Sequence, residues 1–154
     1  NNSNWDWLIV ASVVETSNIQ DLVEVLGANT SNVTSMAFLF YDAASLTNVE
    51  LFDTSNVMSI NSMFWGCHSL RSIPFFDMSN VNDMGSAFMW CSSITSIPQF
   101  NTSKVTSMDS TFQYCGSLVN VPLLDLSSVT DMSGIFINCF NNFLANFKCR
   151  HFRF

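Results

Sequence analysis

Apolar residues recur along the chain in four columns with a fixed step of 24 residues. The columns are Val33, Val57, Val81, Val105 and Val129; Met36, Ile60, Met84, Met108 and Met132; Phe40, Phe64, Phe88, Phe112 and Phe136; and Ala43, Cys67, Cys91, Cys115 and Cys139. Within a unit they are spaced by three, four and three residues, which places them on one face of a helix. The pattern therefore predicts a short amphipathic helix in each unit.

A serine stands just before each of these segments and is a predicted N-cap, because its side-chain oxygen can accept from a backbone N–H of the first turn. These serines are Ser31, Ser55, Ser79, Ser103 and Ser127. The second half of each unit predicts a strand of about four residues, such as the stretch from Leu70 to Ile73. Pro74 follows it, and a proline belongs at a strand end because it has no N–H to donate. We place the last residue of the unit, such as Phe76, at the turn back toward the helix.

One helix and one strand cannot bury an apolar face alone, whereas stacked units share a core and pair their strands. The expected fold class is therefore an α/β repeat solenoid of the leucine-rich-repeat type. A parallel sheet of short strands would form one face and short helices the other. Four full units and one partial unit occupy residues 29–139.

The two ends of the chain depart from the repeat. Residues 1–28 are a predicted N-terminal cap, in which residues 15–28 match the first fourteen positions of a unit and then enter the next unit without a strand. In that alignment the Val, Met and Phe columns are represented by Ile19, Leu22 and Leu26. Residues 140–154 are a predicted C-terminal cap or tail, since the expected Ser-Leu pair is replaced by Asn141 and Asn142.

The unit pattern S-N-V-x-x-M-x-x-x-F-x-x-C-x-S-L-x-x-I-P, as in residues 79–98 with Ile94 at the Leu position, resembles the BspA-like leucine-rich-repeat surface proteins. The resemblance covers Asn29 to about Cys139. It implies a leucine-rich-repeat solenoid that is extracellular or on the cell surface and that adheres to proteins or other surfaces without catalysis. Related proteins of viruses and phages imply an alternative, a virion structural or receptor-binding component that uses the repeat as a spacer or assembly module. No binding residue carries over from the resemblance.

Composition narrows the range of functions. The chain has 154 residues, a formal charge of -7, 48% hydrophobic and 11% charged residues. The apolar content excludes a disordered chain, and the acidic balance argues against nucleic-acid binding, which needs a basic surface. The longest apolar run, around Trp7 to Val14, is far shorter than the roughly 20 residues that span a bilayer, so no membrane insertion is expected.

Charge is distributed unevenly. Three of the five basic residues lie at the C-terminal end, and the remainder of the chain, with twelve acids and two bases, carries -10. The predicted assembly tail consists of Lys148, Cys149, Arg150 and Arg153. Its opposite charge favours head-to-tail self-association. A closing cap and a truncated or frameshifted end are the alternatives. Neighbouring cations favour the Cys149 thiolate and make it the candidate reactive or intermolecular cysteine.

No acid, base and nucleophile occur together at a spacing that suggests catalysis, so no enzyme, cofactor or metal site is predicted. His68 and His151 are isolated from other candidate ligands. The cysteine column predicts buried free thiols, with disulfides between neighbouring units or metal binding as alternatives. The recurring Asp53, Asp77 and Asp125 suggest turn formation, with calcium binding as the alternative.

The predicted binding surface is the face of the sheet. Two residues lie there in each unit, between the inward Leu or Ile and Val or Ile columns: Thr47, Asn48, Arg71, Ser72, Thr95, Ser96, Val119 and Asn120. Short, nearly uncharged side chains favour contact with an extended protein or surface glycan over a deep small-molecule pocket. The alternative is a merely solvated face. A second candidate surface is the recurring aromatic position, which either contacts a partner or covers the edge of the core. It comprises Tyr41, Trp65, Trp90 and Tyr114.

Overall fold

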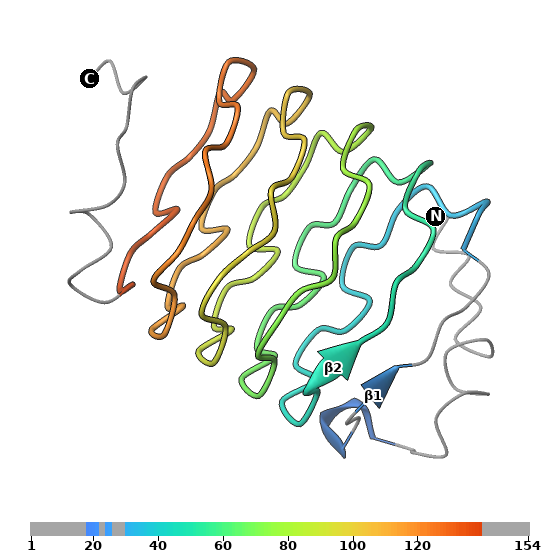
Figure 1. Cartoon of the computed structure of the whole chain (residues 1–154), viewed down its shortest axis with the longest axis vertical. Helices are drawn as coiled ribbons and strands as arrows, with labels where there is room; N and C mark the ends of the chain where they lie inside the picture. Colours follow the sequence, from blue (N-terminus) through green and yellow to red (C-terminus); the bar gives the residue numbers. More distant parts are fainter. Residues whose placement is uncertain (1–17, 22–23, 26–29, 140–154) are drawn as a thin grey trace.

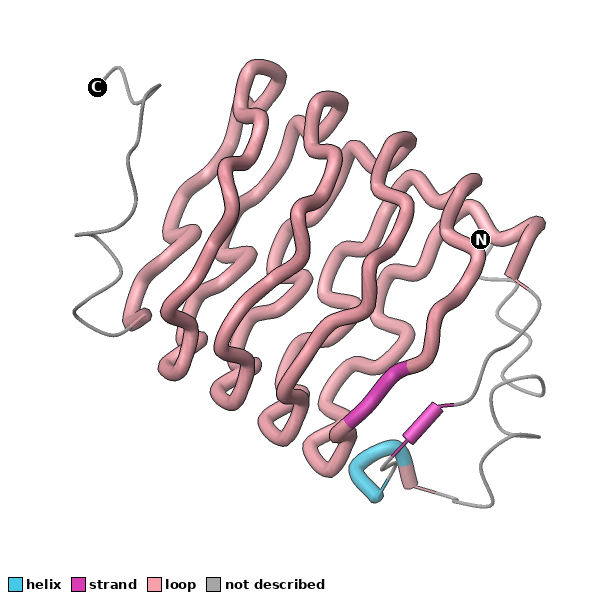
Figure 2. Tube along the Cα trace, viewed as in Figure 1, coloured by secondary structure: helices cyan, strands magenta, loops and turns pink. Residues whose placement is uncertain are grey.

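The computed structural model describes residues 18–21, 24–25 and 30–139. They contain the 3-10 helix η1 (Ile19–Asp21), strand β1 (Glu24–Val25) and strand β2 (Asn48–Val49). The rest of the described chain is made of turns and extended segments (Figure 2). From residue 30 onward, successive coils of about 24 residues lie side by side from the blue to the orange end of the molecule (Figure 1).

Backbone hydrogen bonds join each coil to the next at the step of the repeat. Counting position 1 at residues 29, 53, 77, 101 and 125, the N–H groups at positions 8, 10, 12 and 14 donate to carbonyls at positions 7, 9, 11 and 13 of the following coil. In the third coil, Met84 N donates to Ser107 O at 3.0 Å and Phe88 N to Thr111 O at 3.0 Å. Parallel bridges at position 7 connect Ser35, Ser59, Asp83, Ser107 and Asp131.

The segments predicted to be helical are runs of turns, and η1 is the only helix among the described residues. The N–H groups at positions 11, 13 and 15 donate three residues back, as Ala87 N does to Met84 O at 3.0 Å. Positions 10 and 14 have positive φ in every coil: Phe38, Asp42, Ser62, Gly66, Ser86, Trp90, Ser110, Tyr114, Gly134 and Asn138. A right-handed helix cannot contain such residues, so the 3-4-3 spacing of the apolar columns arises from consecutive turns.

The predicted serine N-caps are also wrong, because no helix follows them and they act as donors. The carboxylate of Asp53 accepts from the backbone N of Ser55 at 3.0 Å and from its Oγ at 2.6 Å. Asp77 and Asn101 repeat the arrangement with the backbone N of the serine two residues later. Position 1 therefore forms a side-chain-stabilised turn, a role typical of Asp and Asn.

Strand pairing in the second halves of the units is sparser than the sequence predicts. Within the described residues, it consists of the pairing of β1 with β2 and a parallel bridge between Ser96 and Asn120. Pro74, Pro98 and Pro122 contribute no donor here. Most of the bonding between coils lies instead at positions 7–14, along the turns.

At the N-terminal end the repeat continues in a register that differs from the prediction. Glu24 pairs with Asn48 and Val25 with Val49, each 24 residues apart, so this segment corresponds to the second half of a unit and contains a strand. Ser45 N donates to Gln20 O at 3.2 Å, as Ser69 N donates to Ala44 O one coil later. The alignment of residues 15–28 with the first half of a unit is therefore wrong at Glu24–Val25.

The four apolar columns and position 24 form one core inside the stack. The Phe column, from Phe40 to Phe136, stacks ring on ring with centroid separations of 5.3–5.6 Å. Phe52 and Phe76 at position 24 are buried and stack on each other at 6.4 Å. Neighbouring coils cover the column residues of the inner coils on both sides. The column residues of the fifth coil are only half-buried.

Candidate functional site

The predicted binding surface is exposed on four successive coils. All eight of its residues are exposed: Thr47, Asn48, Arg71, Ser72, Thr95, Ser96, Val119 and Asn120. We call this surface the polar face. Inward residues flank each pair and hold the two exposed positions outward; they are buried, as Leu46 and Val49 are, except for the half-buried Val121. The polar face carries one charged side chain, Arg71, and one large apolar side chain, Val119.

A row of exposed apolar side chains follows at position 23, which sequence reasoning missed. Leu51, Phe75 and Leu123 are 65%, 63% and 70% exposed, and Gln99 occupies the same position in the third coil. We call these four residues the ridge. A signal for it was present, because positions 23 and 24 are both apolar in three units. Adjacent residues of an extended segment point to opposite sides, so only one of the two can be buried.

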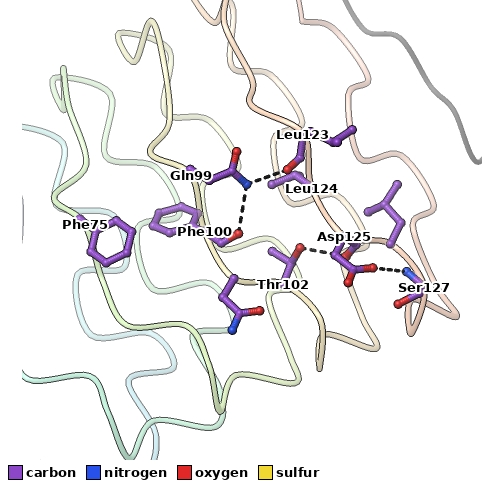
Figure 3. Close-up of a pocket in the computed structure, with 10 residues that line it drawn as sticks. Phe75, Gln99, Phe100, Thr102, Leu123, Leu124, Asp125 and Ser127 are labelled. Atoms are coloured by element: carbon purple, nitrogen blue, oxygen red, sulfur yellow. Dashed lines mark hydrogen bonds between the residues drawn. The ribbon is translucent and has the colours of Figure 1, made fainter.

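A groove of about 820 Å³ opens beside the ridge between the third and fourth coils. Its lining, drawn in Figure 3, includes Phe75, Phe100 and Leu124. The Gln99 side chain turns toward the fourth coil, where its Nε2 donates to Leu123 O at 2.7 Å (Figure 3). The groove is thus bounded by apolar side chains from three coils, with one amide connecting two of them.

A row of carboxylates runs beside the ridge, two residues further along the chain. Asp53, Asp77 and Asp125 are exposed at position 1, and Asn101 takes their place in the fourth coil. We call Asp53, Asp77 and Asp125 the acidic row. Hydrogen bonds from the Ser55 side chain and backbone lower the pKa of Asp53, and those from Ser79 lower that of Asp77. Both carboxylates are therefore ionised at neutral pH.

The four recurring aromatic residues form two stacked pairs. The ring centroids of Tyr41 and Trp65 lie 4.6 Å apart, and those of Trp90 and Tyr114 lie 3.9 Å apart. Tyr41 and Trp90 are exposed and their partners half-buried. In each pair the stacked partner covers one face of the ring. This arrangement favours a structural role for these four residues, covering the edge of the stack of coils. Trp90 and Tyr114 have φ values of 66° and 62°, a costly conformation for bulky residues.

The cysteine column holds free thiols that donate across the core. Cys67, Cys91 and Cys115 are buried, and Cys139 is half-buried. Each Sγ donates to the carbonyl of a Phe 27 residues earlier, as Cys91 does to Phe64 O at 3.1 Å. Burial raises the pKa of Cys67 to about 12 and that of Cys91 well above the ordinary thiol value. These groups remain protonated at physiological pH and are poor nucleophiles.

The remaining residues considered for metal binding or catalysis form no cluster in the described part of the chain. No group of three metal-binding side chains exists within residues 18–21, 24–25 and 30–139. The rings of His68 and Trp90 are arranged nearly perpendicular to each other, with centroids 6.3 Å apart. The predicted tail residues Lys148, Cys149, Arg150 and Arg153, together with His151, lie outside the described residues. In the part of the chain that the structure describes, we find no helix with the length and apolar character needed to cross a bilayer.

Comparison with known protein families identifies a family for this chain. A family model described as "Mycoplasma protein of unknown function, DUF285" matches residues 3–95 and again residues 68–152. No curated protein and no solved structure matches the chain. The two overlapping matches together extend over nearly the whole sequence.

Proposed function

The chain belongs to the DUF285 family, a family of unknown function, and we propose that it is a non-catalytic recognition protein that binds another macromolecule at a cell surface or outside the cell. The polar face is the observation that carries this proposal. Eight exposed side chains repeat on four coils at a constant step, and such an array suits an extended partner. A small molecule would favour a concave site lined by converging polar groups.

We further infer that the chain is a leucine-rich-repeat-like solenoid related to the BspA-like surface proteins. The 24-residue step, the parallel bridges and the shared core of stacked coils support this assignment. In such an architecture each coil contacts only its neighbours and the surface grows with coil number. Such a repeating surface supports the proposal of adhesion to a protein or surface glycan, and location outside the cell is part of the same proposal.

Absence of catalysis is proposed from the chemistry of the described residues. The buried thiols are protonated donors, and the carboxylates of Asp53 and Asp77 accept hydrogen bonds from Ser55 and Ser79. A nucleophile is activated by an adjacent base, a lowered pKa or a metal ion, whereas burial raises the pKa of these thiols. The polar face offers short hydroxyl and amide groups together with Arg71 and Val119.

The proposal is tested by measuring binding of the full chain to immobilised extracellular-matrix proteins and surface glycans by surface plasmon resonance. Ser72→Glu combined with Thr95→Glu places two carboxylates on the polar face and should reduce binding at least about tenfold, a loss of roughly 1.4 kcal/mol. Met58→Glu is the matched control, because Met58 is 49% exposed at position 6, outside the polar face. Equal binding by the two variants, or no binding to any member of the panel, would contradict the proposal.

A further inference from the structure

The ridge and the acidic row run beside each other along the stack. Leu51 lies two residues before Asp53, Phe75 before Asp77, and Leu123 before Asp125, and all six side chains are exposed. At the remaining step of the repeat the two positions are Gln99, at the end of the third coil, and Asn101, at the start of the fourth, so the apolar side chain and the charge are absent together. We call these eight residues the amphipathic strip, since one edge is apolar and the other acidic.

The neutral break in the strip coincides with the groove. Because the Gln99 amide turns to the carbonyl of Leu123, it does not fill the space between the projecting Phe75 and Leu123. Phe100 and Leu124 line the groove between them (Figure 3). The strip therefore has two projecting apolar side chains with a hollow between them, a shape that accepts an apolar side chain from outside.

The net negative charge of the described coils indicates that a partner of the strip carries basic side chains. Residues 30–139 contain eight acids and two bases, Arg71 and Lys104. Arg71 belongs to the polar face, and the Lys104 ammonium donates to Asn80 Oδ1 at 2.8 Å. Within the acidic row, hydrogen bonds from Ser79 lower the pKa of Asp77, and the neighbouring charge of Asp53 opposes that shift only weakly. A cation placed beside the row would favour the ionised carboxylates.

We propose that the amphipathic strip binds an extended protein segment in which apolar and basic side chains alternate. In such a segment successive side chains point to opposite sides, so one set reaches the ridge while the other reaches the acidic row. Neighbouring coils are roughly 4.8 Å apart, so Leu51 and Leu123 are separated by about 14 Å. About five extended residues span that length. This inference rests on the proposed function and names the class of partner.

Short synthetic peptides test the pairing directly. The probe is a dye-labelled Lys-Leu-Lys-Leu-Lys peptide, and its fluorescence polarisation is measured with the full chain at low ionic strength. Glu-Leu-Glu-Leu-Glu and Lys-Ser-Lys-Ser-Lys are the comparison peptides. The first peptide should bind at least about tenfold more tightly than either of the others, and its binding should weaken as salt is added. Equal binding of the lysine–serine peptide would overturn the apolar half of the inference.

Gln99 and Asn101 occur naturally at the ridge and acidic-row positions, so the same residue types can replace their neighbours to locate the peptide-binding surface. Phe75→Gln and Leu123→Gln copy Gln99, and Asp77→Asn and Asp125→Asn copy Asn101, which accepts the same hydrogen bonds from its serine. The double Gln variant should lose about tenfold in peptide affinity, and the double Asn variant should lose several-fold together with much of the salt dependence. Met58→Gln and Asp109→Asn, outside the strip, are the controls and should bind normally. Unchanged binding by both strip variants would overturn the inference.

The same variants separate this inference from the proposed function. If a matrix protein binds and its binding is lost in the polar-face variant but not in the strip variants, the strip is not its docking site and the inference fails alone. If neither surface affects binding of any partner, both fail. Parallel loss of peptide and matrix-protein binding in the strip variants supports the inference.

Discussion

At the scale of single residues, the cysteine column shows how a potentially reactive group is made inert. Cys67, Cys91 and Cys115 are free and buried, and their Sγ atoms donate to main-chain carbonyls at 3.0–3.2 Å. A thiol that donates in this way is protonated, whereas metal binding and alkylation need the thiolate. The column therefore contributes packing and a weak hydrogen bond in each coil.

We expect thiol reagents to distinguish these cysteines from the others in the chain. Native protein at pH 8 should leave Cys67, Cys91 and Cys115 unmodified, because burial raises their pKa and blocks access. Denatured protein should titrate all five cysteines. Mass spectrometry after iodoacetamide treatment locates the modified sites, and Cys149→Ser tests whether the predicted reactive cysteine accounts for the fast fraction. Rapid native labelling of Cys91 would contradict the buried column.

At the scale of the element, the turn segment replaces the predicted helix because its hydrogen bonds go elsewhere. Alternate N–H groups donate to the next coil, and those between them donate three residues back and close four-residue turns. The left-handed residues at positions 10 and 14 change the direction of the backbone, so that both the N–H groups that bond to the next coil and those that close turns find acceptors. Ser86, with φ of 55°, and Gly134, with φ of 68°, occupy the same position in different coils.

This geometry predicts that at position 10 glycine raises the stability of the protein and alanine lowers it, the reverse of their effects in a helix. Ser86→Gly should stabilise the protein by about 0.5–1 kcal/mol, because a left-handed residue with a side chain costs roughly 1–2 kcal/mol. Gly134→Ala, the reciprocal change, should destabilise it by about 1 kcal/mol. In a helix, Ser→Gly would instead destabilise by a few tenths of a kcal/mol. Urea unfolding of each variant gives the sign, and destabilisation by Ser86→Gly would argue for a helix.

At the scale of the whole molecule, stability comes from contacts between neighbouring coils. Removing residues 77–100 joins Phe76 to Asn101 and keeps every column in register. Unfolding should remain cooperative, with a thermal midpoint lower by on the order of 10 °C, because one interface is lost. Removing residues 77–88 places the columns out of register and should abolish cooperative unfolding. Calorimetry compares the two deletions, and similar behaviour would contradict an in-register stack.

The exposure of the polar-face residues could be predicted from the sequence. The inward columns identified the pairs between them, and all eight polar-face residues are exposed. The ridge was not predicted, because Leu51, Phe75 and Leu123 are apolar and resemble core residues in composition. Their exposure follows from the burial of position 24, and which of two adjacent apolar residues turns inward depends on the neighbouring coil. The groove likewise depends on the orientation of the Gln99 amide.

The sequence by itself determined the 24-residue step and the columns that form the core, because identical units bury the same side chains against one another. Only the tertiary structure decided the backbone conformation of each unit. The acceptors of alternate N–H groups lie 23 residues away in the next coil, so no local pattern reveals them. Apolar spacing of three, four and three is compatible with a helix and with consecutive turns. Hydrogen bonding between coils selects the turns.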